Sequence, residues 1–259
     1  MNLWGTLLKI LITNDDGIHA QGIFALKSAL EKIAEVIVVA PDVERSAVGH
    51  AITLSDPLRV YSVEKQGTFF GYAVNGTPAD CVKLGLKSLV EGPVDMVISG
   101  INLGPNTATN IMYSGTVSAA AEAVIMGVPG MAISLASFHI HEFAYAADLS
   151  CDLAGLIYKN GLPEGTLLNV NVPAVPAEEI EGIVVTRQGK GRFEEYFDKR
   201  VDPTNRTYYW LAGKSMSPDY EEDVDDVVLT KKKVSITPIR YDLTDMTMIS
   251  KLKGWGIEK

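Results

Sequence analysis

Cysteine, basic charge and long apolar runs are all scarce in this chain of 259 residues. Its two cysteines, Cys81 and Cys151, are too few for a disulfide framework and too far apart for a paired zinc motif, so we expect reduced, buried thiols and a cytoplasmic protein. Lysine and arginine number 23 against 32 acidic residues, a formal net charge of −9. This balance argues against binding a nucleic-acid duplex, whereas a small anionic ligand would need a metal ion to supply positive charge.

The apolar stretches of the sequence are short and interrupted. The most apolar window, residues 119–136, contains Glu122 and a Pro-Gly pair at 129–130, so we expect no membrane segment. The first 13 residues have neither a basic region nor a small-residue cleavage site, and we interpret them as a strand rather than a signal peptide. With 47% hydrophobic and 21% charged residues, the composition is that of a soluble globular protein.

The amino-terminal half alternates between strand and helix patterns. A β-rich run at 9–13 precedes a polar turn, four apolar residues at helical spacing (Ile23, Leu26, Leu30 and Ile33) and a second strand at 36–41. A strand at 94–99, a small-residue helix at 114–126 and a strand at 131–136 repeat this order. A further helix is predicted at 141–159, followed by strands at 167–173 and 183–186. The order predicts right-handed βαβ units and a Rossmann-like, doubly wound α/β sheet.

The composition changes after residue 190. Residues 192–226 are rich in Tyr, Phe and Trp without helical spacing, which indicates an extended hairpin arm that packs outside the main core and pairs subunits. We therefore expect a single domain over 1–259, with a core at 1–190, a hairpin arm at 191–230 and a carboxy-terminal strand and helix at 231–259. Six of the eight residues at 219–226 are acidic, and we interpret this stretch as a solvated loop.

Oxygen-bearing side chains follow three of the predicted strands. Asp15 and Asp16 come after the first strand, Ser46 after the second, and Asn102 and Asn106 after the third. In an open α/β sheet these loops converge on one crevice at the carboxyl ends of the strands. Two adjacent carboxylates repel each other and so imply a counter-charge, and hard oxygen ligands favour Mg²⁺ or Mn²⁺ over Zn²⁺.

Each of these residues also has a purely structural interpretation. Asp15 and Asp16 are good caps for the helix that follows. Ser46 is a common turn former, and Asn102 and Asn106 are typical turn residues. Taken singly, none of them establishes a site.

The loop that begins at Gly100 leads through Ser114, Gly115 and Thr116 into a helix. The first N–H groups of such a helix form a ready anion site, where a phosphate could bridge from the metal. A general acid is missing from this set. His19 lies three residues beyond Asp16 and is a candidate, but an imidazole at the start of a helix is also an ordinary capping or packing residue.

Taken together, the motifs resemble the signature blocks of the SurE family of stationary-phase survival proteins, in order and spacing, over nearly the whole chain. The blocks are TNDDGIHAQGI, APDVERSAVGHAIT, NGTPADCVKLGL, VISGINLGPNT, YSGTVSAAAEA, DPTNRTYYWLAG and VSITPIRYDLTD. The sequence departs from the family pattern at Gln21, where Pro is frequent, and at Ala47, where Gly is frequent. Neither departure removes a ligand.

The resemblance implies a role for each candidate residue. The family's metal ligands fall on Asp15, Asp16, Ser46 and Asn102, and its phosphate-facing positions fall on Asn106, Ser114, Gly115 and Thr116. It also implies a metal-dependent nucleotidase of nucleoside 5′- and 3′-monophosphates, with exopolyphosphatase activity in many members. The implied assembly is a homodimer or homotetramer with an extended hairpin and a swapped carboxy-terminal segment.

Two other functions remain open from the residues themselves. A non-enzymatic nucleotide-binding sensor would bind the same ligands without turnover. A phosphoaspartyl-type phosphatase also places an Asp after its first strand, but it usually presents Asp-x-Asp with a later Lys, whereas here the two carboxylates are adjacent.

Overall fold

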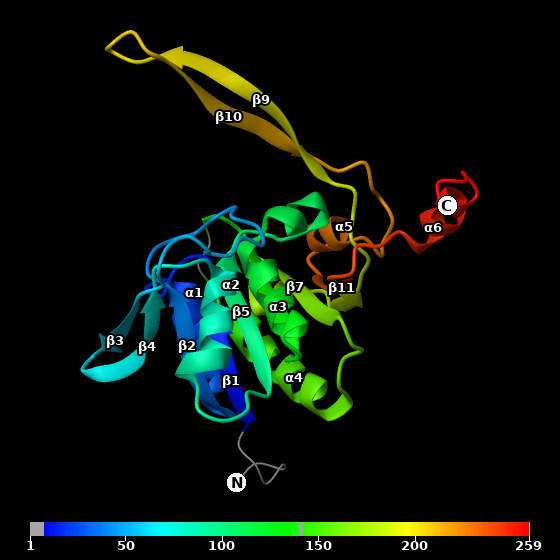
Figure 1. The fold of residues 1–259 in the computed structure, drawn as a ribbon. Helices are drawn as coiled ribbons and strands as arrows, with labels where there is room; N and C mark the ends of the chain where they lie inside the picture. Colours follow the sequence, from blue (N-terminus) through cyan, green and yellow to red (C-terminus); the bar gives the residue numbers. More distant parts are fainter. Residues whose placement is uncertain (1–7, 140–141, 259) are drawn as a thin grey trace.

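The computed structural model describes residues 8–139 and 142–258. The expected strand at residues 1–7 and the first position of the helix predicted at 141 lie outside this range. Within it, nine strands form one sheet in the order β3-β4-β2-β1-β5-β6-β7-β11-β8, and β9 and β10 form a separate hairpin (Figure 1). None of the described helices has the length and apolar character needed to cross a bilayer.

The strands of the large sheet are β1 (Leu8–Thr13), β2 (Ala34–Pro41), β3 (Val60–Lys65), β4 (Thr68–Val74), β5 (Met96–Leu103), β6 (Gly130–Ala136), β7 (Thr166–Pro173), β8 (Ile183–Val185) and β11 (Val234–Arg240). The α-helices are α1 (Gln21–Leu30), α2 (Pro78–Leu84), α3 (Gly115–Ile125), α4 (Ala144–Asn160), α5 (Asp225–Thr230) and α6 (Met246–Lys253). The six central strands from β4 to β7 run parallel, whereas β3 pairs antiparallel with β4 and β11 antiparallel with β7. The doubly wound α/β core is therefore confirmed, in a sheet that is mixed at its edges.

Side-chain alternation along β1 explains why both faces of the sheet are covered. Ile10 and Ile12 are fully buried in the apolar cluster that includes the inner residues of α1 and α4. Leu11, between them, is fully buried in a second cluster with residues of α2 and α3. Because successive strand residues point to opposite faces, an uninterrupted apolar run requires a helix layer on each side.

Most predicted elements lie where the sequence placed them, with shifted ends. Helix α3 begins immediately after Ser114, whose hydroxyl caps it by accepting a hydrogen bond from the Val117 N–H. The third strand was predicted to end at Ser99, but β5 continues through the Gly-rich segment to Leu103. It does so because Asn102 and Leu103 keep their pairing with β6 beyond a local shift in register.

The hairpin of β3 and β4 and the short helix α2 are not predicted by the sequence patterns above. The start of α2 is nevertheless encoded locally, since Thr77 and Asp80 form a reciprocal capping box around Pro78 at the first helical position. This helix packs against α3 and completes one face of the sheet. Its 7 residues make about two turns, which gives too little periodicity for a helix to be predicted from spacing.

The aromatic segment forms the expected antiparallel hairpin, β9 (Arg192–Val201) and β10 (Thr207–Met216), which extends away from the core (Figure 1). The chain then returns to the core, where α5 packs on β7 and β11. The solvated-loop interpretation of 219–226 is wrong for Val224 and Asp225, which are fully buried, because α5 seats them against the core. Helix α6 has no buried residue.

Candidate active site

The candidate residues gather at the carboxyl edge of the central strands. Strand β1 runs parallel to both β2 and β5, so the segments that follow these three strands meet at the same edge. The N–H of Arg45 donates to the main-chain oxygen of Asp15 at 2.7 Å, which joins the loop after β2 to the turn after β1. The start of α3 lies at the same edge, because Gly115 and Thr116 contact the side chain of Asp15.

Asp15 is buried against the first turn of α3. The hydroxyl of Thr116 donates a hydrogen bond to its Oδ1. A Cβ atom at Gly115 would lie 2.9 Å from the Cβ of Asp15, closer than two such carbons approach, so only glycine lets the helix start come this near. The structure thus brings Asp15, Gly115 and Thr116 together, as the sequence analysis predicted for the site.

Asp16 points to the end of β5. Its Oδ2 accepts a hydrogen bond from the Leu103 N–H at 3.3 Å, which places it beside Asn102. Burial, and after it the charge of Asp15, raises the pKa of Asp16 to about 6. Burial also raises the pKa of Asp15, although the Thr116 hydrogen bond opposes this. Two carboxylates held in such surroundings favour a bound cation.

The other two predicted metal ligands differ in how they are placed. The amide nitrogen of Asn102 donates to the main-chain oxygen of Gly104 at 2.7 Å, so its oxygen is the atom left for a ligand. Ser46 is exposed, and its hydroxyl donates to Oε1 of Glu44 at 2.6 Å rather than turning to the aspartates. Because this bond uses only the hydroxyl proton, the lone pairs of the Ser46 oxygen are still available to a cation.

Glu44 is a charged neighbour that the sequence analysis did not select. Its negative charge contributes to the raised pKa of both Asp15 and Asp16. The described residues contain no cluster of three His, Cys, Asp or Glu side chains with metal-site geometry. An oxygen site here would therefore combine the two aspartates with amide or hydroxyl ligands, a donor set that fits a hard divalent cation.

Asn106 is buried, and neighbouring strands hold it firmly. Its N–H donates to Oδ1 of Asn171 at 2.8 Å, and its main-chain oxygen accepts from the amide nitrogens of Asn169 at 2.7 Å and Asn171 at 3.1 Å. Its own amide nitrogen donates to the Ser134 hydroxyl at 2.9 Å. The sequence analysis overlooked the two β7 asparagines, although two buried amides at alternate positions of an apolar strand are a readable signal.

Ser114 is also buried and serves as the amino-terminal cap of α3. Because the cap uses only an acceptor lone pair, the hydroxyl proton of Ser114 still has the capacity to donate. The first N–H groups of α3, at Gly115 and Thr116, have no intrahelical acceptor by the geometry of a helix start. The amino-terminal end of α3 therefore places a partial positive charge next to the carboxylates of Asp15 and Asp16.

The histidines are placed differently from one another. His19 is exposed in the turn before α1, three residues from Asp16. His50 bonds through Nε2 to Oε2 of Glu122 at 2.8 Å, and Lys83 bonds to the other oxygen of Glu122. His50 therefore anchors its loop to α3. His139 is exposed, and His141 lies outside the described residues.

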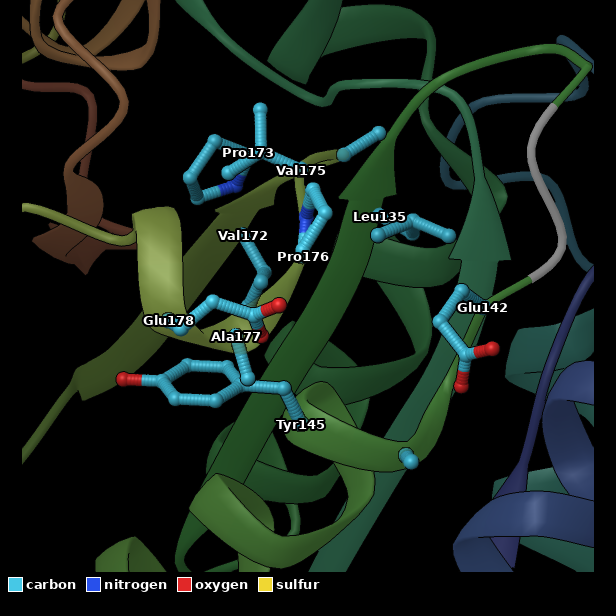
Figure 2. Close-up of a pocket in the computed structure, with 11 residues that line it drawn as sticks. Leu135, Glu142, Tyr145, Val172, Pro173, Val175, Pro176, Ala177 and Glu178 are labelled. Atoms are coloured by element: carbon cyan, nitrogen blue, oxygen red, sulfur yellow. The ribbon is translucent and has the colours of Figure 1, made fainter.

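A cavity of about 490 Å³ lies beside the ends of β6 and β7 and the start of α4 (Figure 2). Leu135, Tyr145, Val172 and Glu178 are among its lining residues. The cavity is lined mainly by apolar atoms, and none of its lining residues is a candidate site residue.

The fold and the site define a doubly wound α/β protein whose ligand crevice, at the strand ends, combines paired carboxylates with a helix amino terminus. The chain matches the family model described as "Survival protein SurE" over residues 10–195. A protein named 5′-nucleotidase SurE from Syntrophus aciditrophicus (strain SB) is 53% identical over 248 residues, which cover 95% of this chain and 93% of the relative. This chain belongs to the SurE family.

Two further comparisons agree over nearly the whole length. The 5′-nucleotidase SurE of Syntrophobacter fumaroxidans is 48% identical over 250 residues, covering 96% of this chain and 100% of the relative. The crystal structure of the SurE protein from Aquifex aeolicus has a TM-score of 0.84 at 40% identity and covers 96% of this chain and 99% of the other. Family membership therefore extends to the hairpin and the carboxy-terminal region.

Proposed function

We propose that this protein is a 5′-nucleotidase that hydrolyses nucleoside 5′-monophosphates to nucleoside and phosphate with the help of one divalent cation, Mg²⁺ or Mn²⁺. The observation that carries the proposal is the approach of Asp15 to Gly115 and Thr116, which sets a carboxylate pair against the start of α3. The names of its relatives in Syntrophus and Syntrophobacter support the same activity.

Asp15, Asp16 and the amide oxygen of Asn102 would hold the cation, with the hydroxyl oxygen of Ser46 as a fourth ligand. This donor set fits the hard, oxygen-preferring cations, and a cation would offset the repulsion from Asp15 that, after burial, raises the pKa of Asp16. A bound cation would supply Lewis-acid stabilisation of the charge on the phosphoryl group.

The remaining residues would act on the phosphate directly. The N–H groups of Gly115 and Thr116 lie at the helix start and would bind phosphoryl oxygens, with the helix dipole adding to the attraction. The Thr116 N–H, which faces the Asp15 carboxylate, would do so only where a phosphoryl oxygen replaces that partner. The Ser114 hydroxyl and the Asn106 amide would donate to the same oxygens. Because these donors are fixed in place before the reaction, they stabilise charge that develops in the transition state without reorganising.

The resemblance to the SurE family supports two extensions of this proposal, hydrolysis of 3′-monophosphates and release of phosphate from short polyphosphate. The exposed aromatic face of the arm supports assembly into a homodimer or homotetramer, with the carboxy-terminal segment exchanged between subunits. Helix α6, which buries no residue in its own chain, is the segment that would be exchanged.

A phosphate-release assay tests the function. The purified protein is incubated with 5′-monophosphates of each base, 3′-monophosphates and short polyphosphate, in Mn²⁺ or Mg²⁺ and after chelation. We expect release from 5′-monophosphates that chelation abolishes and added metal restores. Binding of nucleotide without release would instead favour the sensor, and release that survives chelation would reject the metal-dependent site.

A further inference from the structure

Asp225 is a fully buried carboxylate in an acidic stretch whose other carboxylates are exposed or half-buried. Its Oδ2 accepts a hydrogen bond from the Ala108 N–H at 2.9 Å. Its Oδ1 accepts from the N–H groups of Gly189 at 2.9 Å and Asp226 at 2.8 Å. None of the ion pairs among the described residues includes Asp225, so backbone N–H groups take the place of a cation as its partners.

Two of these N–H groups come from segments far apart in the chain. Ala108 follows β5 and opens the 3₁₀ segment Ala108–Tyr113 that leads to α3, whereas Gly189 precedes the hairpin arm. A Cβ atom at Gly189 would lie 2.9 Å from Oδ1 of Asp225, so the absence of a side chain there admits the carboxylate. Asp225 thus connects the loop that carries Asn106 to the base of the arm.

The backbone at Ala108 needs this support. Its φ of +50° is in the left-handed region, which a residue with a Cβ adopts at a cost. Besides its N–H bond to Asp225, its main-chain oxygen accepts from Nε2 of Gln188 at 2.8 Å. The N–H and the hydroxyl of the next residue, Thr109, both donate to the main-chain oxygen of Gly191, at 3.1 Å and 2.8 Å.

The same loop is held on its other side by β7. Asn169 and Asn171 make three hydrogen bonds with the N–H and main-chain oxygen of Asn106, two residues before Ala108. The conformation of the loop is therefore determined from both sides, by amides of β7 and by the Asp225 carboxylate. Loss of either support would let the Asn106 side chain shift relative to the start of α3.

We propose that Asp225 is a positioning residue, which fixes the backbone at Ala108 so that Asn106 and the first turn of α3 face the phosphoryl group in a productive arrangement. This inference rests on the proposed nucleotidase function. It also assigns a part in the site to the base of the arm, since Gly189 and Gly191 belong to the same hydrogen-bonded network.

The test compares Asp225→Asn with Glu222→Gln. The amide of Asp225→Asn keeps the size of the carboxylate but has one acceptor oxygen, so in either orientation at least one of the N–H groups now bonded to Oδ1 or Oδ2 faces an NH₂ group. Glu222 belongs to the same acidic stretch, is exposed and pairs with Lys231. We expect kcat to fall at least tenfold in Asp225→Asn and to stay within twofold in Glu222→Gln.

Two further readouts separate positioning from simple destabilisation. Calorimetric Mn²⁺ affinity of Asp225→Asn should stay within threefold of the parent, whereas the affinity of the Mn²⁺-loaded protein for inorganic phosphate should fall. A folded Asp225→Asn protein with parental kcat and parental phosphate affinity would overturn the proposal. So would a loss of Mn²⁺ affinity that accounts for the whole loss of rate.

A second variant keeps the test decisive if Asp225→Asn does not fold. Thr109→Val keeps the side-chain volume and removes the hydroxyl bond to Gly191 in the same network, and we expect a kcat reduction of about threefold to tenfold with parental Mn²⁺ affinity. Parental kcat in a folded Thr109→Val protein would then reject the inference. If the parent itself releases no phosphate, the proposed function fails, and phosphate affinity of Asp225→Asn or Thr109→Val still decides the positioning role.

Discussion

Thr116 donates its hydroxyl hydrogen bond to Oδ1 of Asp15, across 101 positions of the sequence. Both groups are buried, and the bond fixes one carboxylate oxygen while the helix that bears Thr116 begins one residue earlier. The contact orients the aspartate and, at the same time, sets the distance between the carboxylate pair and the first N–H groups of α3. It therefore connects the carboxylate pair, which would hold the cation, to the helix start, which would bind the phosphate.

The first prediction removes this hydrogen bond. Thr116→Val keeps the shape of the side chain but has no donor, and a hydrogen bond to a charged group contributes about 1.5 to 3 kcal/mol. We expect kcat/KM for a nucleoside 5′-monophosphate to fall by about one to two orders of magnitude, whereas Thr116→Ser should retain most of it. Steady-state kinetics of both variants is the measurement, and equal activities would show that the hydroxyl has no role in orienting Asp15.

Much of this arrangement was readable from sequence because it is local. The turn at Asp15, the helix start at Ser114 and the parallel strands that bring them together follow from apolar periodicity and capping chemistry, which act over a few residues. The resemblance to a known family then assigned the roles of ligands that, taken singly, are indistinguishable from turn residues.

Other parts of the site depend on tertiary contacts that leave no local trace. Asp225 looked like one more charge in a solvated acidic loop, and only the packing of α5 on the core buries it. Asn171 lies within the strand predicted at 167–173, but its contact with Asn106, 65 positions earlier in the chain, is set by the tertiary fold.

The second prediction concerns the carboxylate pair. Asp15→Asn and Asp16→Asn should each lose most activity at saturating Mn²⁺ while the protein stays folded. The reason is that the pKa of Asp16 is already raised to about 6 by burial and by Asp15, so removing one charge relieves repulsion in the metal-free protein. Phosphate release and thermal unfolding of the chelated proteins are the measurements. Near-parental turnover in both variants would reject the metal-site assignment.

The third prediction separates metal ligands from phosphate ligands. Asn106→Ala should lower kcat with a modest change in KM, at a cost of about 2 to 4 kcal/mol if its amide behaves like other single oxyanion donors. Asn102→Ala should instead weaken Mn²⁺ binding. Calorimetric titration with Mn²⁺ distinguishes the two variants, and equal losses of metal affinity would show that the division between them is wrong.

The fourth prediction concerns the arm. Phe197 and Leu211 are cross-strand partners in the β9–β10 hairpin, and their exposed fractions are 68% and 53%. An exposed apolar pair on an extended hairpin is typical of a protein interface. We expect the parent to sediment as a dimer or tetramer and Phe197→Asp/Leu211→Asp to sediment as a smaller species, with Glu195→Gln as the control. A parent that is monomeric at micromolar concentration would contradict an intersubunit arm.

The last prediction concerns pH and a group away from the proposed ligands. Asp80 of α2 is largely buried and accepts hydrogen bonds from the N–H and hydroxyl of Thr53 at 3.0 Å and 2.6 Å and from the Thr77 N–H at 2.9 Å. Burial alone would raise the pKa of Asp80, but these donors outweigh it and lower the pKa below its ordinary value of 3.8. The two hydrogen bonds from Thr53 also connect the segment that follows the Ser46 loop to α2.

A carboxylate whose pKa is lower in the folded than in the unfolded protein stabilises the fold above the unfolded value, and that contribution is lost as the pH falls through the folded one. Asp80→Asn should therefore lower the free energy of unfolding by about 1 to 3 kcal/mol at pH 7, and this deficit should shrink as the pH is lowered from 7 to 3. The exposed variant Asp56→Asn should show no such trend. Urea unfolding at several pH values measures both variants, and a deficit for Asp80→Asn that is unchanged at pH 3 would mean that the loss comes from packing rather than from the ionised carboxylate.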